Sequence, residues 1–393
     1  MPRIYLDYNA TTPLRGEALE AMTEVLGDHF GNPSSVHWAG AEAREIIDRG
    51  RRQVAALMGV APDGIVFMSS ATEANNTVLR SAALRAPGRG DHIVTCGTEH
   101  PSVLECLEEL REQGLRTTVL PVEPDGRLDP ERFRASLSDR TVLASIMWAN
   151  NETGILQPVP ELAAIAAEEG VRFHTDAVQA LGKLPLSLAE LPIDFASFSA
   201  HKLGGPKGIG ALYARPGSRF TPLLRGGPQE ASRRAGTENV AGVAGFGAAC
   251  TVAGRELADR AGRLGALRDR LWGGIAAKIA DVQVNSPREN SLPHTLNVSF
   301  SGLDGEALVE ALDVEDVAVA SGAACHAGST EPSHVLLAMG VPFELGAGSV
   351  RFSLGAQTQP DEIERVLELL PGLVERVRAA TRAERSARQS LRR

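Results

Sequence analysis

The chain has 393 residues, of which 43% are hydrophobic and 23% are charged, and its formal net charge at pH 7 is -9. A chain of this length can bury a large core and is expected to divide into two domains, and its negative charge argues against a general binder of nucleic acid or membrane surfaces. The opening residues MPRIYLDYNATT contain no apolar signal segment, and no run of about eighteen apolar residues follows, so we expect a cytoplasmic protein that acts on small polar ligands.

Short apolar segments alternate with helical patterns from residue 64 to about residue 214. The apolar segments are GIVFM, HIVTC, TTVLPV, VLASIMWA, VRFHTDA, DFASFSA and GIGALYA, and two of the helical patterns are TEANNTVLRSAAL and ELAAIAAEEG. This alternation predicts an α/β fold with a mainly parallel, doubly wound sheet. Ligands bind at the carboxyl ends of the strands in such sheets, so the residues that follow each strand are the candidates for a site.

The remaining elements predict a second, smaller α+β domain. Residues 240 to 280 have a helical pattern that suits a connector, and LPHTLNVSF, VAVASG and SVRFSLG have the character of strands. PSHVLLAMG and PDEIERVLELLPGLVERVRAA are helical, and the arginine-rich end that includes Arg378 is interpreted as a solvated tail rather than a docking site for an acidic partner. We expect a large domain of residues 12–255 and a smaller domain of residues 1–11 plus 256–393.

Groups at three strand ends together suit one phosphorylated cofactor. Residues 69–73, SSATE, follow one strand and offer the hydroxyls and free N–H groups of a helix N-terminus to an anion. Asp176 follows a second strand, where a carboxylate needs a partner, and Lys202 follows a third. Each feature alone is more often a cap, an ion pair or a surface lysine. In combination they predict pyridoxal 5'-phosphate, with its aldehyde on the lysine, its ring nitrogen on the carboxylate and its phosphate on the hydroxyls.

Lys207 is a rival to Lys202 because both lie in the same glycine-rich loop. Ser199 and His201 favour Lys202, since they add donors for an anion beside it. Two further strand ends fit the same site. His100 could stack on a cofactor ring or move a proton, although a lone histidine is more often structural. Asn150, Asn151 and Glu152 follow another strand, and an asparagine there could bind a substrate carboxylate or the ring hydroxyl, or cap a turn.

The four cysteines lack the spacing of a zinc or thioredoxin site, which favours a reducing compartment. Cys96, Cys106 and Cys250 lie in strand or helix patterns and are interpreted as structural thiols. Cys325 instead lies among small residues in VAVASGAACHAGSTEPSH, with His326 beside it. Cys325 therefore lacks the periodic context that explains the other three thiols.

These residues and motifs resemble the cysteine desulfurases of the NifS/IscS type, in the class V aminotransferase group of pyridoxal-phosphate enzymes. The similarity covers nearly the whole chain, except for about residues 251–290 and the C-terminal tail. It is carried by YLDYNATTP, GNPSS, SSATEANN, TEH, NNETG, FHTDAVQA, SFSAHKLGGPKGIGALY, GGPQE, RRAGTENVAG, LNVSF, SGAACHAGSTEPSHVLLAMG and VRFSLG. The implied fold is fold type I of the pyridoxal-phosphate-dependent transferases.

The resemblance implies a role for each matching residue. Lys202 would hold the cofactor and act as a base, Asp176 would contact the ring nitrogen, Gln179 would reach the ring hydroxyl, and His100 would stack on the ring as a catalytic residue. The phosphate would be bound by Ala71, Thr72, Ser199 and His201 and by the partner subunit's Thr237 in a homodimer. Asn151 would lie at the cofactor and, with Arg351, bind the substrate carboxylate.

The implied reaction converts L-cysteine to L-alanine and leaves the sulfur on Cys325 as a persulfide, which passes to an acceptor such as an iron-sulfur scaffold or a tRNA-thiolation enzyme. No resident metal is implied, although Cys325 could be a transient iron-sulfur ligand. Ala323 and His326 depart from the usual residues around this cysteine. The alternatives are a selenocysteine lyase or aminotransferase of the same fold, and a non-catalytic sulfur carrier or iron-sulfur scaffold.

Overall fold

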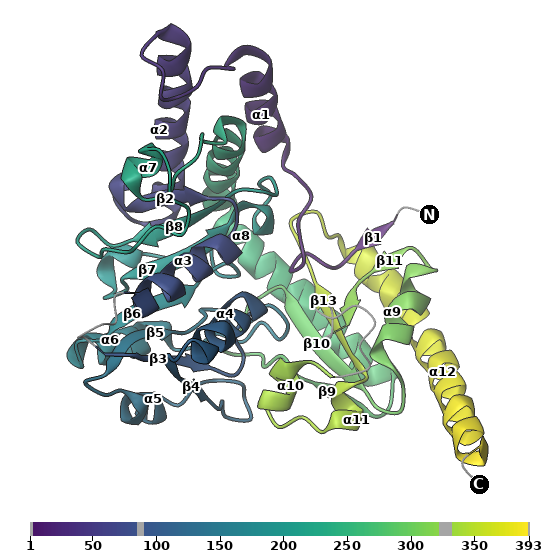
Figure 1. The fold of residues 1–393 in the computed structure, drawn as a ribbon. Helices are drawn as coiled ribbons and strands as arrows, with labels where there is room; N and C mark the ends of the chain where they lie inside the picture. Colours follow the sequence, from purple (N-terminus) through teal and green to yellow (C-terminus); the bar gives the residue numbers. More distant parts are fainter. Residues whose placement is uncertain (1–2, 85–89, 322–331, 392–393) are drawn as a thin grey trace.

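The computed structural model describes residues 3–84, 90–321 and 332–391, with side chains described as far as residue 383, and contains two main sheets with helices around them (Figure 1). The strands are β1 (Ile4–Tyr5), β2 (Ile65–Met68), β3 (His92–Cys96), β4 (Arg116–Leu120), β5 (Thr141–Ser145), β6 (Arg172–Asp176), β7 (Phe195–Ser199), β8 (Gly210–Ala214), β9 (Val282–Val284), β10 (Thr295–Phe300), β11 (Val317–Ala318), β12 (Ala320–Ser321) and β13 (Ser349–Ser353).

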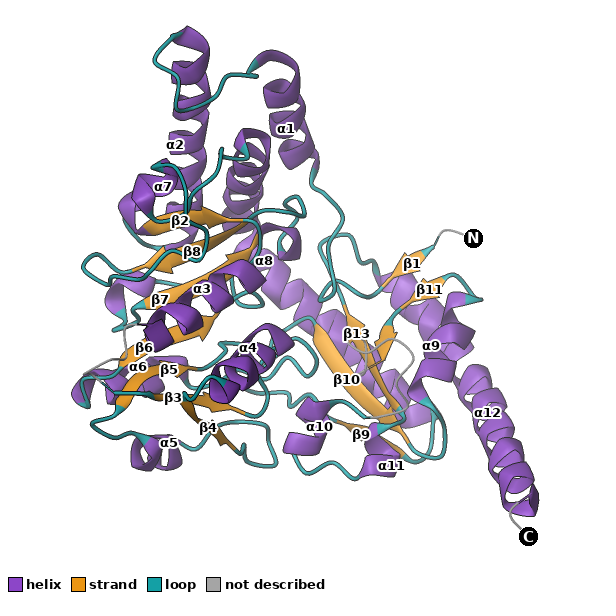
Figure 2. Ribbon diagram, in the orientation of Figure 1, coloured by secondary structure: helices purple, strands orange, loops and turns teal. Residues whose placement is uncertain are grey.

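The helices alternate with the strands between residues 65 and 176, whereas the helices after residue 300 lie with the smaller sheet (Figure 2). They are α1 (Gly16–Asp28), α2 (Trp38–Met58), α3 (Ala71–Leu84), α4 (Pro101–Glu112), α5 (Pro130–Ser136), α6 (Val159–Glu168), α7 (Gln229–Ser232), α8 (Val240–Lys278), α9 (Gly305–Asp313), α10 (His334–Ala338), α11 (Phe343–Gly346) and α12 (Pro360–Leu391). Short 3-10 turns are η1 (Pro62–Gly64), η2 (Leu188–Glu190) and η3 (Ala200–Lys202).

The large sheet has seven strands in the order β2-β8-β7-β6-β5-β3-β4. The pairs among β4, β3, β5, β6 and β7 are parallel, which confirms the mainly parallel sheet expected from the sequence. Strand β8 runs antiparallel to both of its neighbours, β2 and β7. The connection from β7 to β8 can therefore be short, because antiparallel neighbours need no crossover helix. This connection carries Lys202 at the edge of the sheet where the parallel strands end.

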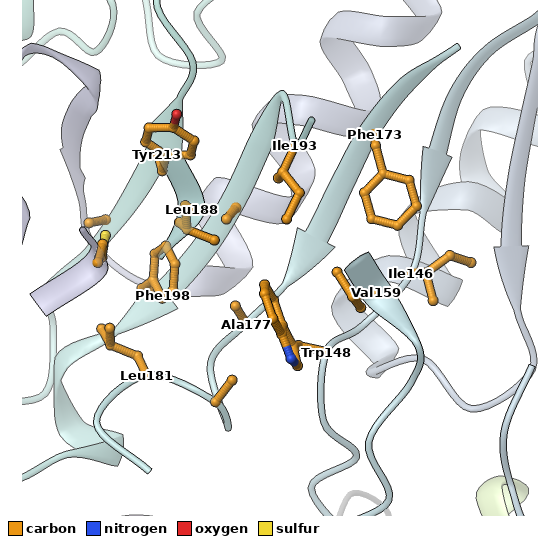
Figure 3. Packing of buried hydrophobic residues seen from close by; sticks show 14 of the residues in the cluster. Ile146, Trp148, Val159, Phe173, Ala177, Leu181, Leu188, Ile193, Phe198 and Tyr213 are labelled. Carbon is orange, nitrogen blue, oxygen red and sulfur yellow. The ribbon is translucent and has the colours of Figure 1, made fainter. Parts of the chain in front are cut away.

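Alternation along the strands separates the core from the site. Phe173, Ala177 and Phe198 are fully buried and pack in one cluster with Trp148 (Figure 3). Complete burial of an aromatic side chain such as Phe198 contributes about 1.5–3 kcal/mol to folding. Successive side chains of β6 and β7 point to opposite faces and almost all are buried, so the strands are packed on both sides and their last residues, Asp176 and Ser199, lie at the edge of the sheet.

The smaller sheet is antiparallel and has the order β12-β13-β10-β9. Strand β1 pairs in parallel with β11, so the beginning of the chain lies with its C-terminal part. The helix predicted between residues 240 and 280 is confirmed as α8, which runs from the large sheet to the smaller one (Figure 1). The division at residue 255 stays a prediction, and it falls inside this helix.

Helix α12 corrects the interpretation of the C-terminal arginines for one residue. The side chain of Arg378 is buried, and its guanidinium donates hydrogen bonds of 2.9 Å to Ser301 O and 2.8 Å to Ala280 O. Arg378 therefore joins α12 to the smaller sheet and is not part of a solvated tail. The sequence pattern missed this role because an arginine with a buried stem and a paired head looks like a surface arginine. No helix in the described part of the chain is both long and apolar enough to cross a membrane.

A buried ion pair holds the strained segment that contains α7. Glu230, Ala231 and Ser232 have φ angles of 49°, 56° and 62°, a region that residues with a Cβ rarely adopt. The Glu230 carboxylate accepts two hydrogen bonds from Arg51, of 2.7 and 2.8 Å, and a third of 2.9 Å from Phe67 N. The pair thereby fixes the segment to α2 and to the edge strand β2.

We predict that Arg51→Met lowers the free energy of unfolding by about 3–5 kcal/mol, because it leaves the buried Glu230 carboxylate without its cation. The matched control is Arg52→Met, since Arg52 pairs with Glu45 through side chains that are 55% and 68% exposed. That variant should change the free energy by no more than about 0.5 kcal/mol. Denaturant unfolding measures both, and equal losses in the two variants would contradict the prediction.

Candidate active site

The carboxyl ends of the parallel strands open into a cavity of about 350 Å³, a size typical of small-molecule sites. Its walls come from the ends of β2, β3, β5, β6 and β7, from the segment after β1 and from β13 of the smaller sheet. The structure brings most of the predicted site residues to this one cavity, namely Ala71, Thr72, His100, Asn151, Asp176, Gln179, Ser199, His201, Lys202 and Arg351.

Lys202 reaches the cavity from η3, directly after β7. Its Nζ donates hydrogen bonds of 2.7 Å to Asn9 O and 2.8 Å to Ala10 O. The rival Lys207 is exposed and does not line the cavity. The geometry therefore favours Lys202 of the two lysines, as expected from its neighbours in the sequence.

Asp176 is 6% exposed at the end of β6. Its Oδ2 accepts a hydrogen bond of 2.8 Å from Asn75 Nδ2, and its Oδ1 accepts one of 3.1 Å from Val178 N. The sequence reasoning expected a cation as partner and missed Asn75. The available signal was the spacing of Thr72 and Asn75, which places them on one face of α3. The donors from Asn75 and Val178 are both neutral groups, so the Asp176 carboxylate suits a protonated ring nitrogen.

The N-terminus of α3 forms a cup of hydrogen-bond donors at the cavity, which we call the anion cup. Ser70 Oγ accepts a hydrogen bond of 3.2 Å from Glu73 N, whereas the amides of Ala71 and Thr72 donate to no other described residue. Free N–H groups at a helix start attract anions. Glycine is required at the neighbouring position 210, because a Cβ there would lie 2.5 Å from Phe198 O and 2.8 Å from Ser70 C. The donor set fits a phosphate.

Thr237 does not line this cavity in the same chain. It is exposed and lies at a separate hollow of about 220 Å³, together with Arg234. Arg234 Nε donates a hydrogen bond of 2.9 Å to Glu73 Oε1, which ties this segment to the start of α3. The expected contribution of the partner subunit's Thr237 stays a prediction.

Both histidines of the site are held as neutral rings. Burial is the main cause that lowers the pKa of His100, and Lys202 lowers it further, while Asp176 acts in the opposite direction. His100 Nδ1 accepts a hydrogen bond of 3.1 Å from Ser102 N, so the ring proton resides on Nε2. Burial and then Lys202 lower the pKa of His201 to about 4, and its Nδ1 lies 3.1 Å from Thr11 Oγ1.

Arg351 comes from β13 of the smaller sheet, so the site needs both sheets. Its side chain is 4% exposed, and it donates hydrogen bonds of 2.9 Å to Asn151 O and 2.7 Å to Asp7 Oδ1. A guanidinium has five N–H donors, which leaves some for a ligand. Gln179 Nε2 donates a hydrogen bond of 3.1 Å to Asn9 O, and its Oε1 accepts one from Lys183. Sequence reasoning missed Asp7, Asn9 and Lys183, since their pairing is visible only in three dimensions.

Cys325, Ala323 and His326 lie outside the described residues. The described chain before them ends in β12, where Ala320 pairs with Arg351. After them, Ser333 caps α10 and donates a hydrogen bond to Glu152. Burial raises the pKa of the Glu152 carboxyl, against the opposing hydrogen bond from Ser333. The described residues on the two sides of the cysteine segment therefore contact Arg351 and Glu152.

Glu99, which precedes His100, is a buried carboxyl with one unsatisfied oxygen. Its Oε1 accepts a hydrogen bond of 2.6 Å from Met147 N, and its Oε2 has no partner among the described residues. Burial raises the pKa of Glu99 to about 8, and Asp176 also acts to raise it. The carboxyl is therefore protonated at neutral pH.

Glu99 should make the protein less stable as the pH rises. Because its folded pKa lies above its unfolded value, its contribution is fully present below the unfolded pKa of about 4.5 and is lost as the pH rises through about 8. The difference in free energy of unfolding between Glu99→Gln and the parent should therefore change by a few kcal/mol in favour of the variant as the pH rises from 5 to 9. Unfolding at several pH values measures this, with the exposed Glu161→Gln as control. Parallel pH profiles for the parent and Glu99→Gln would refute it.

Comparison with known proteins adds the family to this geometry. The model of the aminotransferase class-V family matches residues 4–366. The cysteine desulfurase IscS of Dictyoglomus turgidum is 45% identical over 375 residues, which cover 95% of each protein. A cysteine desulfurase of Cereibacter sphaeroides is 48% identical and covers 96% of this chain and 97% of its own. A solved structure described as a NifS-like protein superposes with a TM-score of 0.90 at 36% identity, over 95% of this chain and all of its own. The chain therefore belongs to the aminotransferase class-V family, and within it to the cysteine desulfurases of the NifS/IscS type.

Proposed function

We propose that this chain binds pyridoxal 5'-phosphate at Lys202 and uses it to transfer the sulfur of L-cysteine to Cys325, releasing L-alanine. One observation carries the proposal: a lysine, a buried carboxylate, an anion cup and an arginine line a single cavity in a chain of the desulfurase family. Once bound, the cofactor supplies an electron sink for carbanion chemistry at the substrate.

Asp176 and the start of α3 orient the cofactor. The Asp176 carboxylate, held by Asn75, would keep a proton on the ring nitrogen. The amides of Ala71 and Thr72, with Ser199 and the neutral His201, would bind the phosphate. Gln179 would contact the ring hydroxyl, and the His100 ring would stack on the cofactor ring. The partner subunit's Thr237 would complete the phosphate contacts in a homodimer.

Arg351 and Asn151 bind the substrate carboxylate. The guanidinium is fixed by Asp7 on one side and by the Asn151 carbonyl on the other, so the substrate meets a preoriented group. This placement would direct the amino group of the substrate toward Lys202, which lines the same cavity. The freed Lys202 amine then removes the α-proton as a general base.

The sulfur step balances without an external oxidant or reductant. The Cys325 thiolate forms an S–S bond with the substrate sulfur while the C–S bond of the substrate breaks and its electron pair stays with carbon, which takes up a proton. The products are L-alanine and a Cys325 persulfide. The persulfide then passes to an acceptor, for which an iron-sulfur scaffold or a tRNA-thiolation enzyme is the expected class. A cytoplasmic location belongs to the proposal, because a free thiol carrier needs a reducing compartment.

The other thiols are poor nucleophiles, which supports the assignment of Cys325. Cys96, Cys106 and Cys250 are all buried. Burial raises the pKa of Cys106 to about 11 and raises the pKa values of Cys96 and Cys250 even further above the ordinary thiol range. Since the thiolate is the reactive form, these three side chains are inert at neutral pH.

We expect Lys202→Ala to lose the near-visible absorbance band of the lysine-bound cofactor and to lower alanine release from cysteine by at least about 10³-fold, because both the attachment point and the base are gone. The matched control is Lys207→Ala, since that lysine is exposed in the same loop. It should keep the band and the rate. A normal band in Lys202→Ala, or its loss in the control, would refute the assignment.

We further expect Cys325→Ala to bind the cofactor normally and to form no persulfide, because the acceptor of the sulfur is missing. Mass spectrometry of each cysteine peptide after incubation with cysteine should find one added sulfur on Cys325 and none on Cys96, Cys106 or Cys250. The absorbance band of the cofactor and the persulfide measurement together distinguish the rival functions. A transaminated product with no persulfide would support an aminotransferase, and neither cofactor band nor product would support a sulfur carrier or scaffold.

A further inference from the structure

Asn9, in the segment that follows β1, forms hydrogen bonds to several separate parts of the site. It is 1% exposed, although it is a polar residue. Its side-chain Nδ2 donates hydrogen bonds of 3.0 Å to Asn151 O and 2.9 Å to Thr295 Oγ1, and its Oδ1 lies 2.9 Å from His294 Nε2. Its main-chain N donates a hydrogen bond of 3.0 Å to Ser353 Oγ.

The partner of His294 fixes the tautomer of that ring. An amide oxygen can only accept, so the ring proton of His294 resides on Nε2 and is donated to Asn9 Oδ1. Burial, helped by Lys183 and other nearby cations, lowers the pKa of His294 well below its ordinary range. The Asn9 side chain is thus fully hydrogen-bonded to neutral groups, which is the condition for a rigid buried polar residue.

The main-chain carbonyl of Asn9 faces the opposite way, into the site. It accepts the hydrogen bonds of 2.7 Å from Lys202 Nζ and 3.1 Å from Gln179 Nε2. The Asn151 carbonyl that the Asn9 side chain contacts is the same one that Arg351 contacts. Asn9 therefore contacts Lys202 and Gln179 directly, and it also contacts the Asn151 carbonyl to which Arg351 donates.

We propose that Asn9 is a positioning residue for Lys202: its side chain, held by Thr295 of β10 and by His294, sets the place of the carbonyl that receives the lysine amine at the edge of the large sheet. The proposal rests on the assignment of Lys202 above. It assigns no contact between Asn9 and the substrate or the cofactor. Asn9 acts through the orientation of its own peptide, which its side-chain hydrogen bonds support in addition to the one that its main-chain N donates to Ser353.

The direct test uses the apoprotein, so that it does not depend on the bound cofactor. Carbonyl acceptors favour the charged lysine over the neutral amine, and only the neutral amine reacts in reductive methylation. In Asn9→Ala the carbonyl loses its support, so we expect the pH midpoint of Lys202 labelling to fall by about one unit. At a fixed pH near 7, this shift makes the methylation of Lys202 about tenfold faster. Peptide mass spectrometry locates the label.

Asn285→Ala is the matched control. Asn285 is 5% exposed and its Nδ2 donates hydrogen bonds of 2.8 Å to Asn297 Oδ1 and Ser299 Oγ, so its removal costs similar buried contacts in the smaller sheet. It does not line the cavity. Lys183, His100 and His201 interact electrostatically with Lys202 and are unchanged in both variants. We expect the control to keep the parental labelling rate at Lys202.

A second variant covers the case in which Asn9→Ala does not fold. Thr295→Val removes one of the two acceptors of Asn9 Nδ2 and nothing that touches Lys202, and it should raise the labelling rate about threefold. Equal labelling in the parent and in the Asn9 and Thr295 variants would overturn the proposal, as would an equal increase in Asn285→Ala.

In the cofactor-loaded protein, the pH titration of the absorbance band should shift in Asn9→Ala and stay in Asn285→Ala. For alanine release, kcat should fall more than KM rises, because the base is displaced and Arg351 keeps its bond to Asp7. If the parent protein gave neither band nor alanine, the proposed function would fail, whereas the methylation result on the apoprotein would still decide the role of Asn9.

Discussion

The site depends on the short segment from Asp7 to Thr12, which joins the two sheets at the cavity. At one end, Asp7 bridges to Ser353 of β13 and binds Arg351. At the other end, Thr12 donates through both its main-chain N and its hydroxyl to His201 O, at 3.0 and 2.8 Å. Between them, the main chain accepts the hydrogen bonds of Lys202. The hydrogen bonds of this segment therefore reach elements of both sheets, which stabilise it together. The geometry of the lysine therefore depends on the assembly of the whole chain.

The charges around the cavity suit the proposed cofactor, which has an anionic phosphate and a basic ring nitrogen. The anion cup at α3 offers amide dipoles and hydroxyls rather than lysines, so it would bind a phosphate without adding a mobile cation. Asp176 accepts a hydrogen bond from an amide, which suits a protonated ring nitrogen. His100 and His201 are kept neutral by burial and by Lys202, which avoids further positive charge beside the lysine. Arg351 brings the remaining cation from the smaller sheet, where Asp7 neutralises part of its charge.

The groups proposed to hold the cofactor and the thiol proposed to carry the sulfur lie on different kinds of chain segment. The cofactor groups lie at the ends of strands whose inner residues, such as Phe173 and Phe198, are fully buried, so the strands hold their terminal side chains in fixed positions (Figure 3). The thiol assigned to sulfur transfer lies on a connection between β12 and α10 instead. A sulfur carrier must meet first the substrate and then a second protein, which a thiol on a packed strand such as Cys96 could not do.

The local sequence pattern predicted much of the fold and several residues of the candidate site. The alternation of apolar segments predicted the mainly parallel sheet and, through the rule that ligands bind at strand ends, Asp176, Lys202 and the cup at residues 69–73, because each of these lies next to its own strand in the sequence. The resemblance to a known family added Gln179 and Arg351. Tertiary structure alone decided the antiparallel β8, the buried position of Arg378 and the choice of Asn75 as the partner of Asp176. It also decided the contacts of Asn9, whose partners are 142 to 344 residues away along the chain. A sequence specifies which groups follow which strand, but the pairing of groups so far apart is fixed only when the two sheets pack and each buried polar atom must find a partner.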